Sequence, residues 1–400
     1  MDKIIERPVY IEKIKAFMDK GLIKVIVGQR RVGKSFIMKQ LWDVILEKNP
    51  SANIVYIDKE RNEFDFIRDY QVLYDFAKGK HKKDTANYLL IDEIQEIGEF
   101  EKALRSLLNE GGFDIYCTGS NADMLSGELA TLLSGRYIEI RVGPLSYLEF
   151  LHFHTIENDN RSLMAYMKYG GLPFLMHLEL EEKLVYDYLK NIYSTILFKD
   201  VVKRYGIRNI AFLESLVFFI SGNIGSLISA KKISDFLKSQ KVNISPRVTL
   251  NYLSYLNKAF LVNKAGRYGI TGKKVFETGE KHFFEDIGIR NALYGFHQAD
   301  IGKIMENVVY NHMISCGYQV SVGQIGNYEI DFVCQKQNET MYVQVAYLIA
   351  NEKTADREYG NLLKIKDNYP KYVVTMDEFQ GNTYQGIGHL HLRGFLSRGW

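Results

Sequence analysis

The feature that most constrains the fold is a glycine-rich stretch near the start of the chain, GQRRVGKS at residues 28–35. Four residues separate Gly28 from the Gly33-Lys34-Ser35 tripeptide, which is the spacing of a phosphate-binding loop. An apolar, β-branched run precedes the loop and a helix-like run follows it. Strand, loop and helix in this order direct backbone N–H groups and the positive end of the helix dipole at phosphates. The stretch therefore predicts an α/β nucleotide-binding domain.

Within the loop, we expect the Lys34 ammonium to reach the β- and γ-phosphates and the Ser35 hydroxyl to bind Mg²⁺. Lys34 is also a predicted catalytic residue, because its charge would neutralise charge that develops on the phosphates. The predicted nucleotide contacts comprise the loop and the residue after it: Gly28, Gln29, Arg30, Arg31, Val32, Gly33, Lys34, Ser35 and Phe36.

A second apolar run, NYLLIDE, ends in Asp92 and Glu93, and the strand-like run NIVYID lies between it and the loop. An acidic residue at the carboxyl end of a strand lies where open α/β sheets bind their ligands. We expect Asp92 to bind Mg²⁺ directly or through water, and Glu93 to orient and polarise the attacking water. Alone this pattern is weak, but behind the glycine-rich loop it predicts a nucleotide-hydrolysing site.

Two further positions are candidates for catalysis. FDIYCTGS predicts a strand, and Ser120 or Asn121 at its end could sense the γ-phosphate, although a simple Gly-Ser turn explains the same residues. Arg136 precedes a fifth predicted strand and could reach a phosphate in a neighbouring subunit. An arginine used in this way is worth about 10³–10⁵ in rate. A surface arginine at a helix C-terminus is the alternative interpretation.

Several motifs together carry a family resemblance: GQRRVGKS, LLIDEIQ, TGSNADMLSGELATLLSGR, PLSYLEF and GGLP. They resemble bacterial and archaeal AAA-type ATPases that carry a C-terminal domain of unknown function, and the resemblance covers essentially the whole chain. It implies the AAA+ (ASCE) type of P-loop NTPase fold, an α/β fold with parallel strands in the order 5-1-4-3-2. It also implies ATP and Mg²⁺ as cofactors, and it supports the roles given above to Lys34, Ser35, Asp92, Glu93, Ser120 or Asn121, and Arg136.

The resemblance has two departures in the predicted lid, residues 145–210. No clear arginine is present to act as a second sensor of the nucleotide. Instead, GGLP at 170–173 resembles the glycine–proline motif of signal-transducing (STAND-type) ATPases, in which the proline packs on the adenine. This adds Pro173 to the predicted nucleotide contacts and favours a slow switch over a fast motor. Residues 7–10, before the first strand, either line the base or cap the N-terminus.

Residues 211–280 are predicted to form a winged helix, with helices at 228–240 and 245–260 and a two-strand wing at 261–276. Residues 201–280 hold 13 Lys and Arg against 4 Asp and Glu, in a chain whose net charge is +3. Such a basic module is typical of phosphate-backbone binding, although a winged helix can also make protein contacts. The predicted DNA contacts are Arg247, Thr249 and Asn251 on the second helix, and Lys273 and Lys274 on the wing.

Residues 281–400 show the order helix–strand–strand–strand–helix–strand, which resembles the PD-(D/E)XK nuclease-like fold. Glu306 and Asp331 match two of its acidic positions and are candidate ligands of a divalent metal. The third motif reads Gln344-Val345-Ala346 and lacks the lysine, which Lys353 or Lys364 would have to supply from elsewhere. The pattern therefore favours an inactive, binding-only domain over an active nuclease.

The chain has 400 residues, and its three cysteines lie far apart, which argues against a disulfide framework or a zinc ribbon. No signal peptide and no membrane-spanning run is evident, so a cytoplasmic protein without membrane contact is expected. We predict four domains, 1–144, 145–210, 211–280 and 281–400. The predicted function is Mg²⁺-dependent ATP hydrolysis coupled to DNA binding, with homo-oligomers in the ATP state. The alternatives are a slow ATP switch that binds a protein partner, and an ATP-dependent nuclease.

Overall fold

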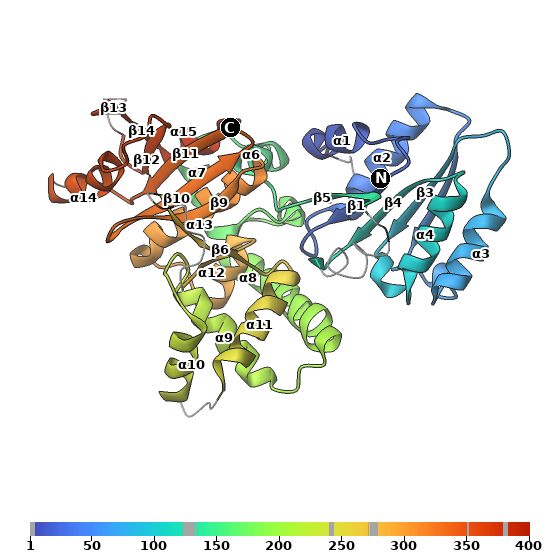
Figure 1. Cartoon of the computed structure of the whole chain (residues 1–400), viewed down its shortest axis with the longest axis horizontal. Helices are drawn as coiled ribbons and strands as arrows, with labels where there is room; N and C mark the ends of the chain where they lie inside the picture. Colours follow the sequence, from blue (N-terminus) through green and yellow to red (C-terminus); the bar gives the residue numbers. More distant parts are fainter. Residues whose placement is uncertain are drawn as a thin grey trace. The chain divides into compact units, whose positions relative to one another are not determined.

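The computed structural model describes residues 5–122, 133, 135–239, 244–270, 272, 279–349, 352–378 and 383–400. The chain forms two compact units, which are described separately (Figure 1). The first unit comprises Met1–Gly143 with Lys258–Phe260, and the second comprises Pro144–Asn257 with Leu261–Trp400. The finer division of residues 145–400 into lid, winged helix and nuclease-like domain stays a prediction.

The first unit is built on a five-stranded parallel sheet in the order β2-β3-β4-β1-β5. This order confirms the predicted 5-1-4-3-2 arrangement and the P-loop NTPase fold. The strands are β1 (Ile23–Val27), β2 (Asn53–Asp58), β3 (Asn87–Asp92), β4 (Asp114–Gly119) and β5 (Tyr137–Arg141).

Helices cover both faces of this sheet. They are α1 (Pro8–Lys15), α2 (Lys34–Lys48), α3 (Tyr70–Lys80) and α4 (Phe100–Glu110), with short 3₁₀ helices η1 (Asn62–Phe64) and η2 (Ile94–Glu96). In Figure 1, α3 and α4 lie together on one side of the sheet and α1 and α2 lie on the other. Because parallel strands covered on both faces have no solvent side, β1 and β3 are buried at every position. The carboxyl ends of β1, β3 and β4 are thereby held at one edge.

The second unit contains a seven-stranded mixed sheet in the order β13-β14-β12-β11-β10-β9-β7. In chain order these strands are β7 (Arg267–Gly269), β9 (Gln319–Ile325), β10 (Tyr328–Lys336), β11 (Glu339–Val345), β12 (Lys371–Thr375), β13 (Thr383–Tyr384) and β14 (Ile387–His391). A separate antiparallel pair is formed by β6 (Val262–Ala265) and β8 (Lys281–Phe284).

The helices of the second unit precede and flank these sheets. The first of them are α6 (Tyr147–His154), α7 (Asn160–Tyr169), η4 (Pro173–His177), α8 (Glu182–Thr195), the π-helical η5 (Ile196–Lys203) and α9 (Ile210–Gly222). They are followed by α10 (Ala230–Ser239), α11 (Pro246–Lys258), α12 (Ile287–Tyr294), η6 (Gln298–Asp300), α13 (Ile301–Ser315), α14 (Glu352–Leu363) and α15 (Leu392–Leu396). In the described ranges, no helix combines the length and apolarity needed to cross a membrane.

In the part of the predicted wing that the structure describes, the strands do not pair with each other. β6 pairs with β8, more than ten residues further along the chain, while β7 lies parallel to β9 at the edge of the large sheet. All four residues of β8 are buried, so this strand needs an inner partner, whereas β7 is only half-buried and fits an edge. Closeness in sequence and the glycines between the runs suggested a hairpin, whereas the burial of β8 favours the observed pairing.

The two glycines of the GGLP stretch allow α12 to pack closely on the end of α7. A Cβ on Gly170 would lie 2.4 Å from Oδ1 of Asp286, and a Cβ on Gly171 would lie 2.5 Å from the carbonyl oxygen of Leu145. The Gly171 N–H donates to Oδ2 of Asp286 at 2.7 Å, and the other oxygen of this carboxylate accepts from Ile289 N at the start of α12. The glycines are thus required by packing within the second unit.

Candidate nucleotide site

The glycine-rich loop between β1 and α2 brings backbone, not side chains, to the carboxyl edge of the sheet. A Cβ on Gly28 would lie 2.1 Å from the carbonyl oxygen of Val142, so no side chain fits there. Gly33 has a φ of +95°, which favours glycine, and it immediately precedes the first helical residue, Lys34. The N-terminus of α2 therefore opens onto the loop, as an anion site requires.

Lys34 and Gln29 have polar groups that suit a phosphate ligand. The Lys34 side chain is 4% exposed, and its Nζ donates to the carbonyl oxygens of Gly28 and Gln29, each at 3.0 Å. The Gln29 side chain is fully buried, and both polar atoms of its carboxamide lack a partner among the described residues. A buried amide without a partner is costly, so this loop fits a ligand that the chain itself does not supply.

Arg7 connects the loop to the end of the sheet. Its Nη1 donates to the carbonyl oxygens of Val32 and Gly143, both at 3.0 Å, and its guanidinium stacks on Tyr10. The sequence allowed residues 7–10 either to contact the base or to cap the N-terminus. In the structure, Arg7 holds the phosphate-binding loop through its hydrogen bond to Val32. Sequence reasoning did not find this role, because the carbonyl groups that Arg7 binds carry no signal in the residue types.

Asp92, at the end of β3, lies beside Ser35. The Ser35 and Thr118 hydroxyls both hydrogen-bond to the Asp92 carboxylate, and the Tyr56 hydroxyl lies 3.4 Å from its other oxygen. Burial raises the pKa of Asp92, and the two hydroxyl hydrogen bonds oppose this effect. A serine hydroxyl beside a carboxylate at this edge is the pair of hard oxygen ligands that Mg²⁺ prefers, so these residues fit the expected ion.

Glu93 has an unusual backbone conformation that sets the direction of its side chain. Its φ and ψ are 54° and 50°, a left-handed conformation that non-glycine residues rarely adopt. The Glu93 N–H donates to Oγ1 of Thr118 at 2.9 Å. Because Thr118 also donates to Asp92, one hydroxyl fixes both acidic residues relative to β4. Strain of this kind is typical of functional positions.

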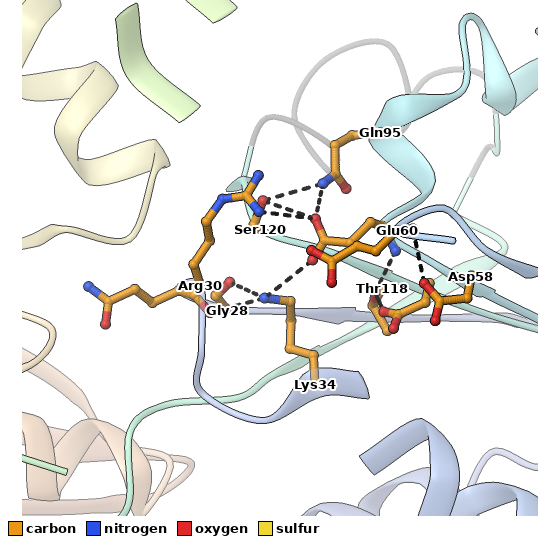
Figure 2. Close-up of polar contacts among 11 residues, drawn as sticks. Gly28, Arg30, Lys34, Asp58, Glu60, Gln95, Thr118 and Ser120 are labelled. Carbon is orange, nitrogen blue, oxygen red and sulfur yellow. Dashed lines mark hydrogen bonds and ion pairs between the residues drawn. The ribbon is translucent and has the colours of Figure 1, made fainter. Parts of the chain in front are cut away.

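Four polar side chains surround the Glu93 carboxylate. Gln95 Nε2 donates to Oε2 of Glu93 and also to Oγ of Ser120, and the Ser120 hydroxyl lies 3.5 Å from the same carboxylate oxygen. The cations of Arg30 and Lys34 each lie 3.9 Å from a Glu93 oxygen. Figure 2 shows Arg30, Lys34, Gln95 and Ser120 converging from the loop, η2 and the end of β4. Gln95 was not predicted from the sequence.

The remaining predicted positions in the first unit differ in accessibility. Ser120 and Asn121 are fully buried at the end of β4, and Ser120 lies beside Glu93. Phe36 is 53% exposed and Arg31 is exposed with a φ of +67°. Arg136 is exposed just before β5 and donates to the side chain of Asn109 on α4. The roles of these residues toward the nucleotide stay predictions.

The predicted adenine contact and the predicted DNA contacts fall in the second unit or outside the described residues. Pro173 is the first residue of η4, and its contact with the adenine stays a prediction. On α11, Arg247 is exposed, but Thr249 is fully buried and its hydroxyl donates to the carbonyl oxygen of Ser245. The predicted DNA contact of Thr249 is therefore wrong, because position 249 lies on the side of α11 that packs inward. Asn251 is exposed, and Lys273 and Lys274 lie outside the described residues.

The candidate metal ligands of the C-terminal region come together, but with a lysine between them. Glu306 on α13 and Asp331 on β10 each lie 3.0 Å from Nζ of Lys281 on β8. Burial lowers the pKa of Lys281, but the charges of Asp331, Glu306 and Glu329 outweigh this effect and raise it overall. The sequence reasoning did not find Lys281, which is 50 positions from Asp331.

Comparisons with known proteins agree with the geometry of the first unit. Residues 20–151 match the AAA domain family, and residues 160–300 match a domain of unknown function (DUF8612). The chain is 37% identical over 399 residues to an uncharacterized protein of Haemophilus influenzae, with 98% of each chain covered. It is 31% identical over 410 residues to an uncharacterized protein of Methanocaldococcus jannaschii, covering 97% of this chain and 89% of that protein.

Among solved structures, the Walker-type ATPase of Pyrococcus abyssi is similar in fold. The superposition has a TM-score of 0.50 at 16% sequence identity, and it covers 72% of this chain and 95% of that one.

Proposed function

Because this chain belongs to the same family as the uncharacterized proteins of Haemophilus influenzae and Methanocaldococcus jannaschii, and because its residues 20–151 match the AAA domain family, we propose that it binds Mg²⁺·ATP at residues 28–35 and hydrolyses it to ADP and phosphate. The observation that carries the proposal is the convergence of Lys34, Ser35, Asp92 and Glu93 at one edge of the parallel sheet. Chemically, this is a cation, two hard oxygen ligands and a carboxylate base around a loop of backbone donors.

Residues of the loop would hold the phosphates. Lys34 would exchange its two carbonyl hydrogen bonds for phosphate oxygens, and the Gln29 carboxamide, which has no partner among the described residues, would gain one. Ser35 and Asp92 would hold Mg²⁺, which when bound neutralises charge on the transferred phosphoryl group.

Glu93 would orient the attacking water and accept its proton. Its carboxylate is 3.9 Å from both Lys34 and Arg30, so phosphates that attract these cations would draw them away from the carboxylate and let water approach it. Gln95 and Ser120 then keep one carboxylate oxygen fixed while the other faces the water. General base assistance of this type contributes about 10²–10⁴ in rate.

The test is steady-state ATP turnover and nucleotide binding by the full chain and by Glu93→Gln. We expect the variant to bind ATP within about threefold of wild type and to lose at least about 100-fold in turnover. Glu99→Gln, an exposed carboxylate paired with Lys102 near the same strand, is the matched control and should retain activity. Equal turnover in Glu93→Gln and wild type would refute the role of this carboxylate.

We also propose that hydrolysis is coupled to DNA binding through residues 201–280. The net charge of this segment and the exposed side chains of Arg247 and Asn251 on α11 support the proposal. Binding of duplex DNA should weaken steeply with salt, and Arg247→Glu should weaken it about tenfold. Arg105→Glu, an exposed arginine on α4, is the control. An equal effect of the two variants, or no salt dependence, would contradict the proposal.

The GGLP resemblance to switch-type ATPases supports a second candidate, a slow switch that binds a protein. ATP that stays bound through purification, with turnover unchanged by DNA, would favour this candidate over DNA-coupled hydrolysis.

A further inference from the structure

A lysine side chain occupies the place where the nuclease resemblance of the C-terminal region expects a metal ion. Nζ of Lys281 lies 3.0 Å from Oε2 of Glu306, 3.0 Å from Oδ1 of Asp331 and 2.9 Å from Oε1 of Glu329. The Lys281 side chain is 2% exposed, so it is almost fully shielded from bulk water. An ammonium has three donors, and each of them has a carboxylate partner here.

Both oxygens of Asp331 and one oxygen of Glu306 are already engaged. The second oxygen of Asp331 accepts from Val345 N at 2.9 Å, and Oε1 of Gln344, at the third position of the nuclease motif, accepts from Asp331 N at 3.2 Å. A hard divalent ion requires six or more oxygen ligands, several of them from freely oriented carboxylates or water. The residues present therefore do not fit the metal that the fold resemblance implies.

The backbone also closes the space beside Glu306. Gly225, which follows α9 and has a φ of +69°, approaches so closely that a Cβ on it would lie 2.8 Å from Oε2 of Glu306. The Gly225 N–H lies 3.3 Å from the carbonyl oxygen of His282, the residue after Lys281. In the part of the chain that the structure describes, no group of three or more His, Cys, Asp or Glu side chains has the arrangement of a metal site.

We propose that Lys281 is the resident cation of this fold: its ammonium replaces the divalent ion, and the C-terminal region is a metal-independent scaffold that does not cleave nucleic acid. The ammonium joins the β6–β8 pair to α13 and β10, which come from a different part of the chain. A divalent ion carries more positive charge than the ammonium. To bind here it would have to displace the Lys281 side chain, whose backbone is held in β8 by the pairing with β6.

The test uses Lys281→Met in the full chain without nucleotide, compared by thermal unfolding in EDTA and in 1 mM MnCl₂. Methionine has nearly the volume of lysine but leaves three carboxylates without a cation. We expect the melting temperature of the variant to fall by at least several degrees in EDTA and to be at least half restored by Mn²⁺. Wild type should show no such restoration. Lys264→Met, an exposed lysine paired with Glu280, is the control and should do neither.

A second measurement decides the question if Lys281→Met does not fold. Mn²⁺ binding is followed by electron paramagnetic resonance in three proteins: wild type, Asp331→Asn, and the triple variant Lys281→Met/Glu306→Gln/Asp331→Asn. The triple variant lacks both the ammonium and two of its carboxylate partners. We expect Asp331→Asn to bind as much Mn²⁺ as wild type, and the triple variant to fold and add no site. Bound Mn²⁺ that is lost in Asp331→Asn, or Mn²⁺-dependent DNA cleavage that is lost in it, would overturn the proposal. Neither measurement depends on ATP hydrolysis.

Discussion

Replacing Gly170 by alanine tests whether the GGLP glycines serve packing inside the second unit. The new Cβ would lie 2.4 Å and 2.6 Å from the two oxygens of Asp286, a contact that no ordinary side chain tolerates. Asp286 is fully enclosed and cannot simply rotate away, because its oxygens accept from the N–H groups of Gly171 and Ile289. Either the α7–α12 contact opens or these hydrogen bonds break.

The magnitude follows from two contributions. Gly170 has φ and ψ of 79° and −164°, a region used almost only by glycine, and alanine there costs about 1–3 kcal/mol. Losing the hydrogen bond from Gly171 to a charged carboxylate adds about 1.5–3 kcal/mol. We therefore expect Gly170→Ala to lower the free energy of unfolding of the second unit by about 2.5–6 kcal/mol.

The two tryptophans of the chain allow this unit to be followed by itself. Trp42 lies on α2 in the first unit, and Trp400 packs on Phe395 and Tyr372 in the second. In a Trp42→Phe background, urea unfolding monitored by Trp400 fluorescence reports the second unit alone. Gly206→Ala is the matched control, since Gly206 also has a positive φ, +61°, but no atom lies within 4 Å of a Cβ there.

Alanine at 206 should cost only the backbone strain, about 1–2 kcal/mol. If Gly170→Ala and Gly206→Ala shift the urea midpoint equally, the packing argument is refuted, and the glycines of GGLP would need another explanation.

Three further predictions concern the Glu93 carboxylate, the proposed role of Arg136 in a neighbouring subunit, and pH. Gln95→Leu should lower ATP turnover about 10–100-fold while ATP affinity stays within about threefold, because a hydrogen bond to the charged Glu93 is lost; an unchanged turnover would contradict this. Arg136→Ala should abolish any rise of specific ATPase activity with protein concentration, measured over a dilution series, and a rise that persists would argue against a role in trans. Burial lowers the pKa of His282 and of His312 to about 4, so below pH 6.5 the unfolded chain binds protons that the folded chain does not. Stability should therefore fall by about 1.5 kcal/mol per histidine between pH 6.5 and 5, which urea unfolding at both pH values would detect.

The family resemblance implied the sheet order of the first unit, and the residues themselves indicated which apolar runs form its strands. The phosphate-binding spacing fixes β1 and α2, and buried apolar runs mark the other strands, so the edge that carries Asp92 and Ser120 follows from topology. Gln95 could not be predicted, because its contact with Glu93 depends on a left-handed turn at a non-glycine residue. Nothing in the residue types signals that conformation. The sequence also did not show that Thr249 lies on the buried face of α11, because the spacing of apolar residues on this helix does not indicate which face packs inward.

Lys281 shows that a motif can lack its lysine in the sequence while a lysine from another part of the chain lies beside the motif's carboxylates in the structure. The third nuclease position has Ala346 where the family has lysine, and Lys364, one of two candidates to replace it, lies exposed over the ring of Tyr328. The cation arrives instead from β8, upstream of the whole helix–strand–strand–strand order, because β6 and β8 pair beside α13. A catalytic lysine acts beside a metal ion, whereas this ammonium contacts both candidate metal ligands directly. A lysine beside the carboxylates would support an active metal site, whereas a lysine between them supports replacement of the metal. The distances of 3.0 Å from Lys281 to Glu306 and to Asp331 distinguish these two arrangements.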